Sequence, residues 1–283
     1  MSAFAEHLPA LLGQSVRGFL LMAAIFVPLE FAFARARIPL LRHQFWTDLG
    51  YYFFNGMVPA LVLTAILGYV AHLVSPLYAS GLYSWIAYIP VPVKFVLAII
   101  VGDVGAYWGH RWSHEVPFLW YFHKIHHQAE SIDWLVTSRA HPVDMIFLKF
   151  CGVMAIYLAG LAQGSLGQGT ALMSIYVILG GLWAFFVHAN INWRFGILEK
   201  YLATPAFHHW HHSNESPESI DKNYAAIFPF IDRYFGTYHL PSQRWPAYCG
   251  LRVSPAARPL AEHCSADPTL HCKPSDETDA SLS

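Results

Sequence analysis

The segment GDVGAYWGHRWSHEVPFLWYFHKIHH, residues 102–127, joins the end of an apolar stretch to two closely spaced groups of histidines. A third group follows in HHWHH, residues 208–212. Eight histidines at helical spacing make up the three groups: His110 and His114; His123, His126 and His127; and His208, His211 and His212. Residues three or four positions apart share one face of a helix, so each group predicts two or three imidazoles that point the same way.

The composition around these groups is that of a membrane protein. Of the 283 residues, 55% are hydrophobic and only 12% are charged, whereas a soluble domain has about 25% charged residues. The mean hydropathy is +0.36. The formal net charge is −1, so the chain has no general positive field and we expect no nucleic-acid partner.

Five apolar stretches are long enough to cross a hydrocarbon core about 30 Å thick. They are residues 16–34, 49–74, 84–108, 143–161 and 170–189. Prolines interrupt the third stretch. One or both of the third and fourth stretches could form a re-entrant hairpin instead of a full membrane crossing. The expected fold is all-α: a multi-pass helical membrane protein with a cytosolic helical cap that holds a histidine-rich dimetal site.

Basic residues predict the orientation of the chain. Lys and Arg follow the first, third and fifth stretches, whereas the loops at 75–83 and 162–169 contain neither. Because basic loops stay in the cytosol, the histidine groups are expected on the cytosolic face. The predicted organisation is N-terminal transmembrane helices over 1–101, a catalytic domain with a transmembrane hairpin over 102–240, and a disordered polar tail over 254–283.

Crowded imidazoles predict metal binding. Mutual repulsion favours the neutral form of histidine, and neutral imidazole is the form that binds metals. With His188 at the end of the fifth stretch, nine histidines are available, more than the four or so ligands of one zinc ion. Two ions with four or five ligands each would keep open positions, as dioxygen chemistry requires. The four cysteines show no CxxC spacing, so no thiolate site is expected.

Acidic residues near the histidines are expected to orient them through the second imidazole nitrogen. Asp103 lies two helical turns before His110, and Glu130 closely follows the second group. Asp103 has an alternative as an interfacial carboxylate that faces lipid headgroups. Asp144 and Glu199 are weaker candidates for the same role.

The order HRWSH, HKIHH, RAHP, HAN and HHWHH, between residues 102 and 240, resembles the fatty acid hydroxylase and sterol desaturase superfamily of integral membrane enzymes. The superfamily acts on sterols, fatty acyl chains, alkylglycerols and carotenoids. The resemblance implies that nine histidines hold two iron ions: His110, His114, His123, His126, His127, His188, His208, His211 and His212.

Two features depart from the pattern of the superfamily. Some relatives have HxxxH where this chain has His188 and Asn192, so Asn192 or His141 is expected to complete the metal site, or His141 to support it. His209 lies off the shared face of its group and is expected to face the substrate entrance or solvent.

The resemblance also implies the reaction. A lipid from the bilayer would be hydroxylated or desaturated at an unactivated C–H bond, with dioxygen as oxidant. The chain has no GxGxxG with an acidic partner and no CxxCH, so no flavin, haem or nicotinamide site is expected. Electrons would come from an external ferredoxin, small cytochrome or flavin reductase, steered by a basic face of Arg111, Lys124, Arg139 and Arg194.

Two other classes of protein remain as alternatives. A zinc-dependent membrane hydrolase would need a glutamate general base, but the chain has neither HExxH nor HxxEH. A non-enzymatic membrane metal-binding protein would place its ligands along a path through the bilayer, whereas these histidines are expected to gather at one face.

Overall fold

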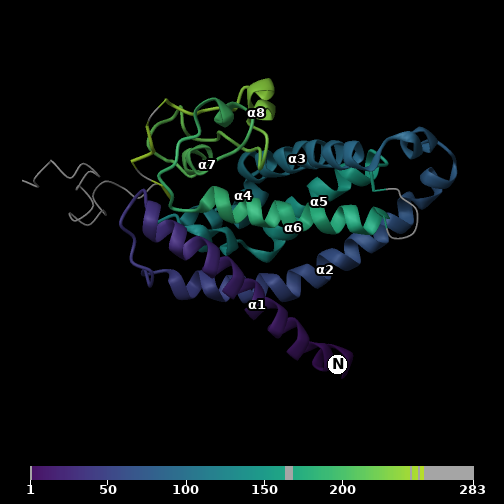
Figure 1. Ribbon diagram of the computed structural model, residues 1–283, viewed down its shortest axis with the longest axis horizontal. Coiled ribbons are helices and arrows are strands. Elements are labelled where there is room, and N and C mark those ends of the chain that lie inside the picture. Colours follow the sequence, from purple (N-terminus) through teal and green to yellow (C-terminus); the bar gives the residue numbers. More distant parts are fainter. Residues whose placement is uncertain (1, 163–167, 243, 248, 252–283) are drawn as a thin grey trace, which may run out of the picture. The chain divides into compact units, whose positions relative to one another are not determined.

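The computed structural model describes residues 2–162, 168–242, 244–247 and 249–251. The expected tail over 254–283 lies outside the described residues. Within them the chain is helical and forms no strand, so the prediction of an all-α fold is confirmed. The long helices are α1 (Ser2–Phe33), α2 (Phe45–Ala79), α3 (Val91–Glu115), α5 (Pro142–Leu158) and α6 (Gln168–His188), which run alongside one another (Figure 1).

Short helices connect the long ones and form the part of the chain that carries most of the histidines. The α-helices are α4 (Pro117–His123), α7 (Pro205–His211) and α8 (Pro229–Phe235), and the 3₁₀ helices are η1 (Ser84–Tyr88), η2 (His126–Gln128), η3 (Trp134–Ser138) and η4 (Gly196–Lys200). A proline stands in the first turn of α3, α4, α5, α7 and α8. Proline suits this place because its fixed φ is already helical and the missing N–H has no partner there.

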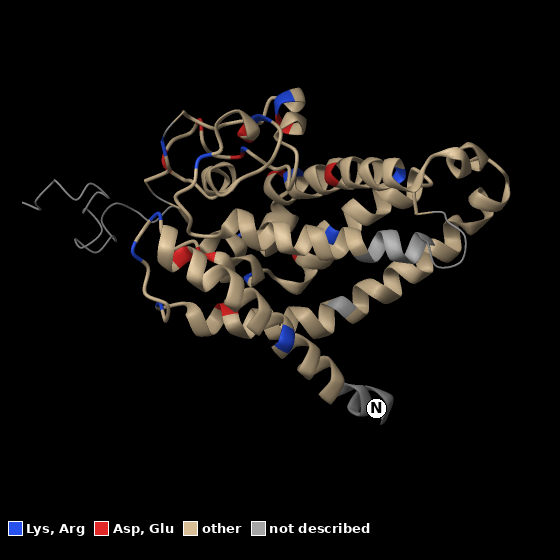
Figure 2. Cartoon of the chain, viewed as in Figure 1, with Lys and Arg blue, Asp and Glu red and all other residues tan. Residues whose placement is uncertain are grey.

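Three helical stretches are long and apolar enough to span a membrane: Pro9–Phe33, Phe45–Ala79 and Val91–Glu115. Among the described residues this is three crossings rather than the five expected. Helix α5 has 17 residues, fewer than the about 20 that a crossing needs. Helix α6, which covers the last expected stretch, has 21 residues, and its segment Ile175–His188 is apolar. Charged residues gather around α7, α8 and the nearby helix ends, and the far halves of the helices carry few (Figure 2).

The third expected stretch, 84–108, does not form one helix. Residues Ser84–Tyr88 make the short η1, and α3 begins only after Pro90. A proline disfavours the helical conformation in the residue before it, so Pro90 keeps Ile89 extended, and α3 begins at Val91 with Pro92 in its first turn. As a result α3 runs on to Glu115 and carries His110 and His114 in its last two turns.

Helices α3 and α5 touch along glycines. A Cβ atom on Gly105 would lie 2.5 Å from the carbonyl oxygen of Cys151 and 2.7 Å from the Cβ of Ala155. One on Gly109 would lie 2.8 Å from the Cβ of Cys151. Small residues spaced along one face allow such close approach between membrane helices. The glycines therefore fix the position of the α3 end that carries the first histidine group.

Polar side chains of α1 and α2 hold the segment after the second histidine group. Glu30 accepts hydrogen bonds from the backbone N–H groups of Trp134 and Asn190, at 2.8 and 2.9 Å. Asn55 donates to the carbonyl oxygen of Ala140 at 2.9 Å. The two N-terminal helices thus reach the histidine region through hydrogen bonds to its backbone.

A buried ionic cluster reinforces this link. Arg42 bonds Asp48 and Asp133, each at 2.6 Å, and Arg139 bonds Asp48 at 2.5 Å. All four side chains are buried. Removing one partner from a buried pair leaves an uncompensated charge, so such a cluster fixes its backbone segments firmly in place.

The expected basic face for an electron donor is therefore incomplete. Arg139 belongs to the buried cluster. Arg194 is paired with Glu199 at 2.8 Å. Arg139 is therefore not part of an exposed basic face, whereas Arg194 is partly exposed, and the steering of a donor by the basic residues stays a prediction.

Substitution of Gly105 tests the packing of α3 on α5. We expect Gly105→Val to lower the free energy of unfolding by about 1–3 kcal/mol, because the new methyl groups meet a backbone carbonyl. Thermal unfolding of the purified protein in detergent measures the change. Gly68→Val on α2 is the control, since nothing lies within 4 Å of a Cβ there. Equal melting temperatures of the two variants would contradict the close contact.

Candidate metal centre

The nine histidines expected to bind metal lie together in two groups. The first group holds His110, His114, His123, His127 and His211, and the second holds His126, His188, His208 and His212. Within each group the ligand nitrogens all lie within 4.8 Å of one another. Rings of the two groups are also in contact, since the centroids of His127 and His212 are 4.5 Å apart.

The sequence motifs do not coincide with these groups. His123 ends α4, and the chain then turns into η2, so His126 joins the second group while His127 stays with His123 in the first. In HHWHH, His211 joins the first group and His212 the second. The prediction that each motif points its imidazoles one way is confirmed for His110 and His114, which both lie in the first group. It is wrong for the other two motifs, because a turn interrupts the helix in HKIHH and because HHWHH supplies ligands to both groups.

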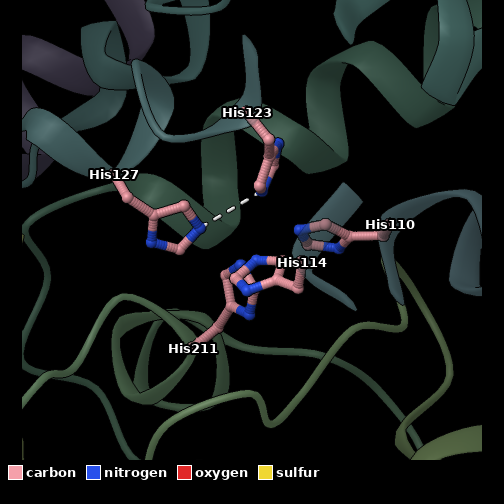
Figure 3. Close-up of side chains that lie close together, drawn as sticks. All are labelled: His110, His114, His123, His127 and His211. Carbon is pink, nitrogen blue, oxygen red and sulfur yellow. Dashed lines mark hydrogen bonds between the residues drawn. The ribbon is translucent and has the colours of Figure 1, made fainter. Parts of the chain in front are cut away.

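Backbone and carboxylate oxygens orient the rings of the first group, four of which hold an Nδ1 contact of 2.8 to 3.0 Å (Figure 3 shows the rings). The Nδ1 of His110 donates to the Tyr224 carbonyl, and that of His211 to the Lys222 carbonyl. His123 contacts the carboxylate of Asp144, and His114 that of Asp221, as shown next. Each contact leaves Nε2 free to face the other rings.

One of the two carboxylate partners, Asp144, is a weaker candidate from the sequence, and the other is not expected from it. Asp144 accepts from His123 Nδ1 at 3.0 Å and is itself buried. Asp221, which the sequence did not single out, accepts from His114 Nδ1 at 3.0 Å. Its only sequence signal is its place nine residues after HHWHH, and it has a left-handed backbone conformation with φ of 56°. The tertiary fold, rather than spacing along the sequence, brings Asp221 next to His114.

The second group is held in a similar way by backbone oxygens. His126 Nδ1 donates to the Arg139 carbonyl at 3.0 Å, and His188 Nδ1 to the Ala184 carbonyl at 2.8 Å. The Nε2 atoms then meet: His126 and His188 are 3.1 Å apart, and His188 and His208 are 2.9 Å apart. The Arg139 carbonyl belongs to the residue fixed by the buried ionic cluster.

The donor set fits a metal ion. With their Nδ1 protons on carbonyls, His126 and His188 present two Nε2 lone pairs to each other, and lone pairs repel unless a cation lies between them. Two ligands at right angles, about 2.1 Å from one ion, would be about 3.0 Å apart, close to the 3.1 Å observed. In the first group, the Nε2 atoms of His110, His114 and His211 are buried without a hydrogen-bond partner.

Protonation of the imidazoles is a poor alternative to a metal ion between the facing nitrogens. Burial, followed by the neighbouring imidazoles, lowers the pKa of the site histidines of η2 and α7 well below the usual value of 6.5: His126, His127, His208, His211 and His212. These rings are therefore neutral at pH 7. Neutral imidazole suits zinc, copper, iron and nickel.

Asp103 does not touch a site histidine. Its two oxygens accept hydrogen bonds of 2.6 to 3.1 Å from the backbone N–H groups of Ala226, Ile227 and Phe228. The expectation that it orients an imidazole directly, and the alternative that it faces lipid headgroups, are both wrong. It holds the segment that carries the Tyr224 carbonyl, and so acts on His110 only through the backbone.

The other expected supporting residues also lie outside the two groups. Glu130 is exposed. His141 caps the start of α5, where its Nδ1 accepts from the Val143 N–H at 3.2 Å. Asn192 is exposed, and its backbone N–H bonds the Phe33 carbonyl at 2.8 Å. Neither His141 nor Asn192 completes the nine-histidine set, because each is committed to the end of a helix.

His209 faces neither solvent nor an entrance. It is fully buried, its Nε2 donates to the His188 carbonyl at 3.3 Å, and its ring lies 5.4 Å from that of Trp245. Burial, with the nearby Arg35, lowers its pKa to about 3. It packs behind the second group and supports the end of α6.

A fatty acid hydroxylase family profile matches residues 95–237, just over half of the chain. The chain belongs to the fatty acid hydroxylase family. The match contains all nine histidines and both carboxylates that contact them. Membership places the chain among membrane lipid hydroxylases and desaturases, and the resemblance inferred from the motifs is confirmed.

Relatives within this family act on different lipids. The chain is 30% identical over 61% of its length to an ornithine lipid hydroxylase of Rhizobium tropici, of which it covers 50%. It is 34% identical over 50% of its length to the alkylglycerol monooxygenase of Danio rerio, covering 30% of that protein. It is 26% identical over 56% of its length to a Δ7-sterol 5(6)-desaturase of Gibberella zeae, covering 44%. The chain thus spans half or less of these relatives, and no solved structure matches it.

Two adjacent histidines of this family member provide a test of the grouping. We expect His208→Asn to lose metal, because His208 Nε2 faces His188 Nε2, whereas His209→Asn should keep it, because His209 points away. Metal per chain, measured by mass spectrometry on purified protein, separates the two. If both variants remained folded and lost similar amounts of metal, this would contradict the assignment of His208, and not His209, to the second group.

The ionic cluster gives a second test. We expect Asp48→Asn to lower the free energy of unfolding by about 3 kcal/mol, since it leaves buried guanidinium charge uncompensated. Because Asp48 holds Arg139, the substitution should also move the Arg139 carbonyl that orients His126, and the second group should then bind less metal. The control is Glu115→Gln, which breaks the exposed pair with Arg111 and should change little. Metal content and melting temperature are measured together, and an unchanged pair of values for Asp48→Asn would refute the link.

Proposed function

We propose that this chain is a membrane-bound diiron oxygenase that hydroxylates or desaturates an unactivated C–H bond of a lipid, with its histidines on the cytosolic face. The observation that carries the proposal is the pair of adjacent, largely buried groups made only of imidazole nitrogens. We further propose residues 102–240 as the catalytic unit and 1–101 as its membrane anchor.

The nine histidines would hold the two ions unequally, with five ligands in the first group and four in the second. Neither group would fill all six coordination positions of its own ion, so positions for dioxygen and substrate remain at both ions. Bound iron would supply the activation of dioxygen and the oxidation of the C–H bond. The protein contributes ring orientation, through Nδ1 contacts, and exclusion of water, through burial of the rings.

Neighbouring groups keep the site stable between turnovers. The carboxylates of Asp144 and Asp221 increase the basicity of His123 and His114, which favours binding of a cation. The second group has only carbonyl partners among its described Nδ1 contacts. We infer that the first group holds its ion more tightly.

The proposed substrate is an apolar lipid that enters from the bilayer. The relatives named above act on an ornithine lipid, on alkylglycerols and on a sterol, and all three substrates partition into membranes. Three long apolar helices adjoin the histidine region in this chain. An acyl lipid or a sterol-like molecule is the class that this setting supports.

Electrons must reach the site from outside the chain. Hydroxylation consumes one dioxygen, two electrons and two protons, and yields the alcohol and one water. Desaturation consumes the same and yields the double bond and two waters. The sequence has no motif for a flavin, haem or nicotinamide cofactor. We therefore propose an external ferredoxin, small cytochrome or flavin reductase as the donor.

The proposal is tested with His126→Ala. We expect this variant to lose turnover and iron while it remains folded in the membrane, because His126 faces His188 in the second group. His141→Asn is the control, since asparagine preserves the cap of α5 and His141 lies outside both groups. Cellular lipids are profiled by mass spectrometry with the wild type and each variant, and iron is measured in the purified proteins.

Three outcomes would contradict the proposal. Full activity of His126→Ala would remove the metal role of this residue. Stoichiometric zinc with lipid hydrolysis, and no oxygen uptake, would support a zinc-dependent hydrolase instead. Metal binding without any change in lipids would leave a metal-binding protein that is not an enzyme.

A further inference from the structure

Large apolar side chains lie exposed on η4 and α8, two short helices that contact each other. We name this surface the η4–α8 edge, and its apolar members are Ile197, Leu198, Tyr201, Phe230 and Tyr234. Their exposed fractions run from 41% to 83%. Single exposed apolar residues are ordinary, but a contiguous group of this kind marks a contact surface.

The two helices sort their charges by sign. The acidic side chains turn inward: Glu199 is buried and bonds Arg194, and Asp232 is buried and accepts from the backbone N–H of Tyr224 at 2.8 Å. The basic side chains, Lys200 and Arg233, are exposed. The η4–α8 edge is therefore apolar and positively charged, with no exposed carboxylate of its own.

The position of α8 along α3 indicates how deep α8 lies relative to the bilayer. Ile231 of α8 packs in one hydrophobic cluster with Tyr107 of α3, and Val104 and Trp108 pack against that cluster. At about 1.5 Å per residue, Val104 and Trp108 lie about 20 and 26 Å from Val91, the first residue of α3. A hydrocarbon core is about 30 Å thick. Helix α8 thus lies beside the membrane-spanning helix, near the boundary of the core.

The opposite boundary is marked by aromatic residues before α3. Trp85 and Tyr88 of η1 are exposed, at the end of α3 remote from the histidines. Trp and Tyr are enriched at both interfaces of a bilayer. Counted from this end, the second interface falls close to α8, where Tyr201 and Tyr234 are exposed.

We propose that the η4–α8 edge rests in the headgroup region of the bilayer, with its apolar side chains among the upper acyl chains and with Lys200 and Arg233 on anionic lipid phosphates. This surface would hold the histidine-bearing short helices against the membrane. An apolar face bordered by Lys and Arg is the pattern that binds anionic interfaces. The proposal does not depend on the metal or the reaction.

Photo-crosslinking in a bilayer tests the proposal. The full chain is placed in nanodiscs of equal phosphatidylcholine and phosphatidylglycerol, with p-benzoylphenylalanine at Tyr234 or at Tyr201. We expect irradiation to add lipid mass to the chain at both positions, at least five-fold more than with the same group at Glu218. Glu218 is the control because it is exposed and acidic. At both test positions the substitution exchanges one exposed aromatic side chain for another, so it does not disturb the buried core.

The charge component is tested separately. In the Tyr234-labelled chain, phosphatidylglycerol should exceed its share of the bilayer among the adducts, and Lys200→Gln with Arg233→Gln should return it to that share. Lipid adducts no more frequent than at Glu218 would overturn the proposal, as would crosslinks mainly to a second copy of the chain. An unchanged phosphatidylglycerol excess in the double variant would overturn the role of the two basic residues.

Discussion

The structure depends on one unfavourable arrangement: neutral imidazoles whose Nε2 lone pairs face one another at about 3 Å. His126 and His188 show it most clearly, because both Nδ1 atoms donate to carbonyl oxygens and the two Nε2 atoms are 3.1 Å apart. Such a set cannot hold itself together, because lone pairs repel and protons bind poorly in a buried site. The rest of the fold must impose it until a cation compensates.

The fold imposes it by fixing the second nitrogen of six of the nine rings, those of His110, His114, His123, His126, His188 and His211. The oxygens that accept from Nδ1 come from α5, from the end of η3, from within α6 and from residues 221–224. These segments are held in turn by buried carboxylates, including Asp48, Asp103 and Asp232. The oxygens that orient the imidazoles are thus fixed by residues outside the two histidine groups.

The membrane helices take part in the same arrangement. Glycine contacts bring α3 close to α5, and Ser113 of α3 donates a hydrogen bond to Asp144 of α5 at 3.3 Å. Glu30 and Asn55 extend this support from α1 and α2 to the segment around η3. The apolar helices and the histidine region are therefore one packed unit, which suits a family whose members act on membrane lipids.

Local sequence determined the helical class, the apolar segments and the identity of the nine histidines, because helical spacing and hydropathy are properties of neighbouring residues. It did not determine which histidines share a group, that Asp144 and Asp221 rather than Glu130 contact them, or that Asp103 bonds backbone N–H groups. Those pairings join residues up to 125 positions apart. Only the tertiary structure decides them, since the turn at 124–125 and the close packing of α3 on α5 set directions that no local period encodes.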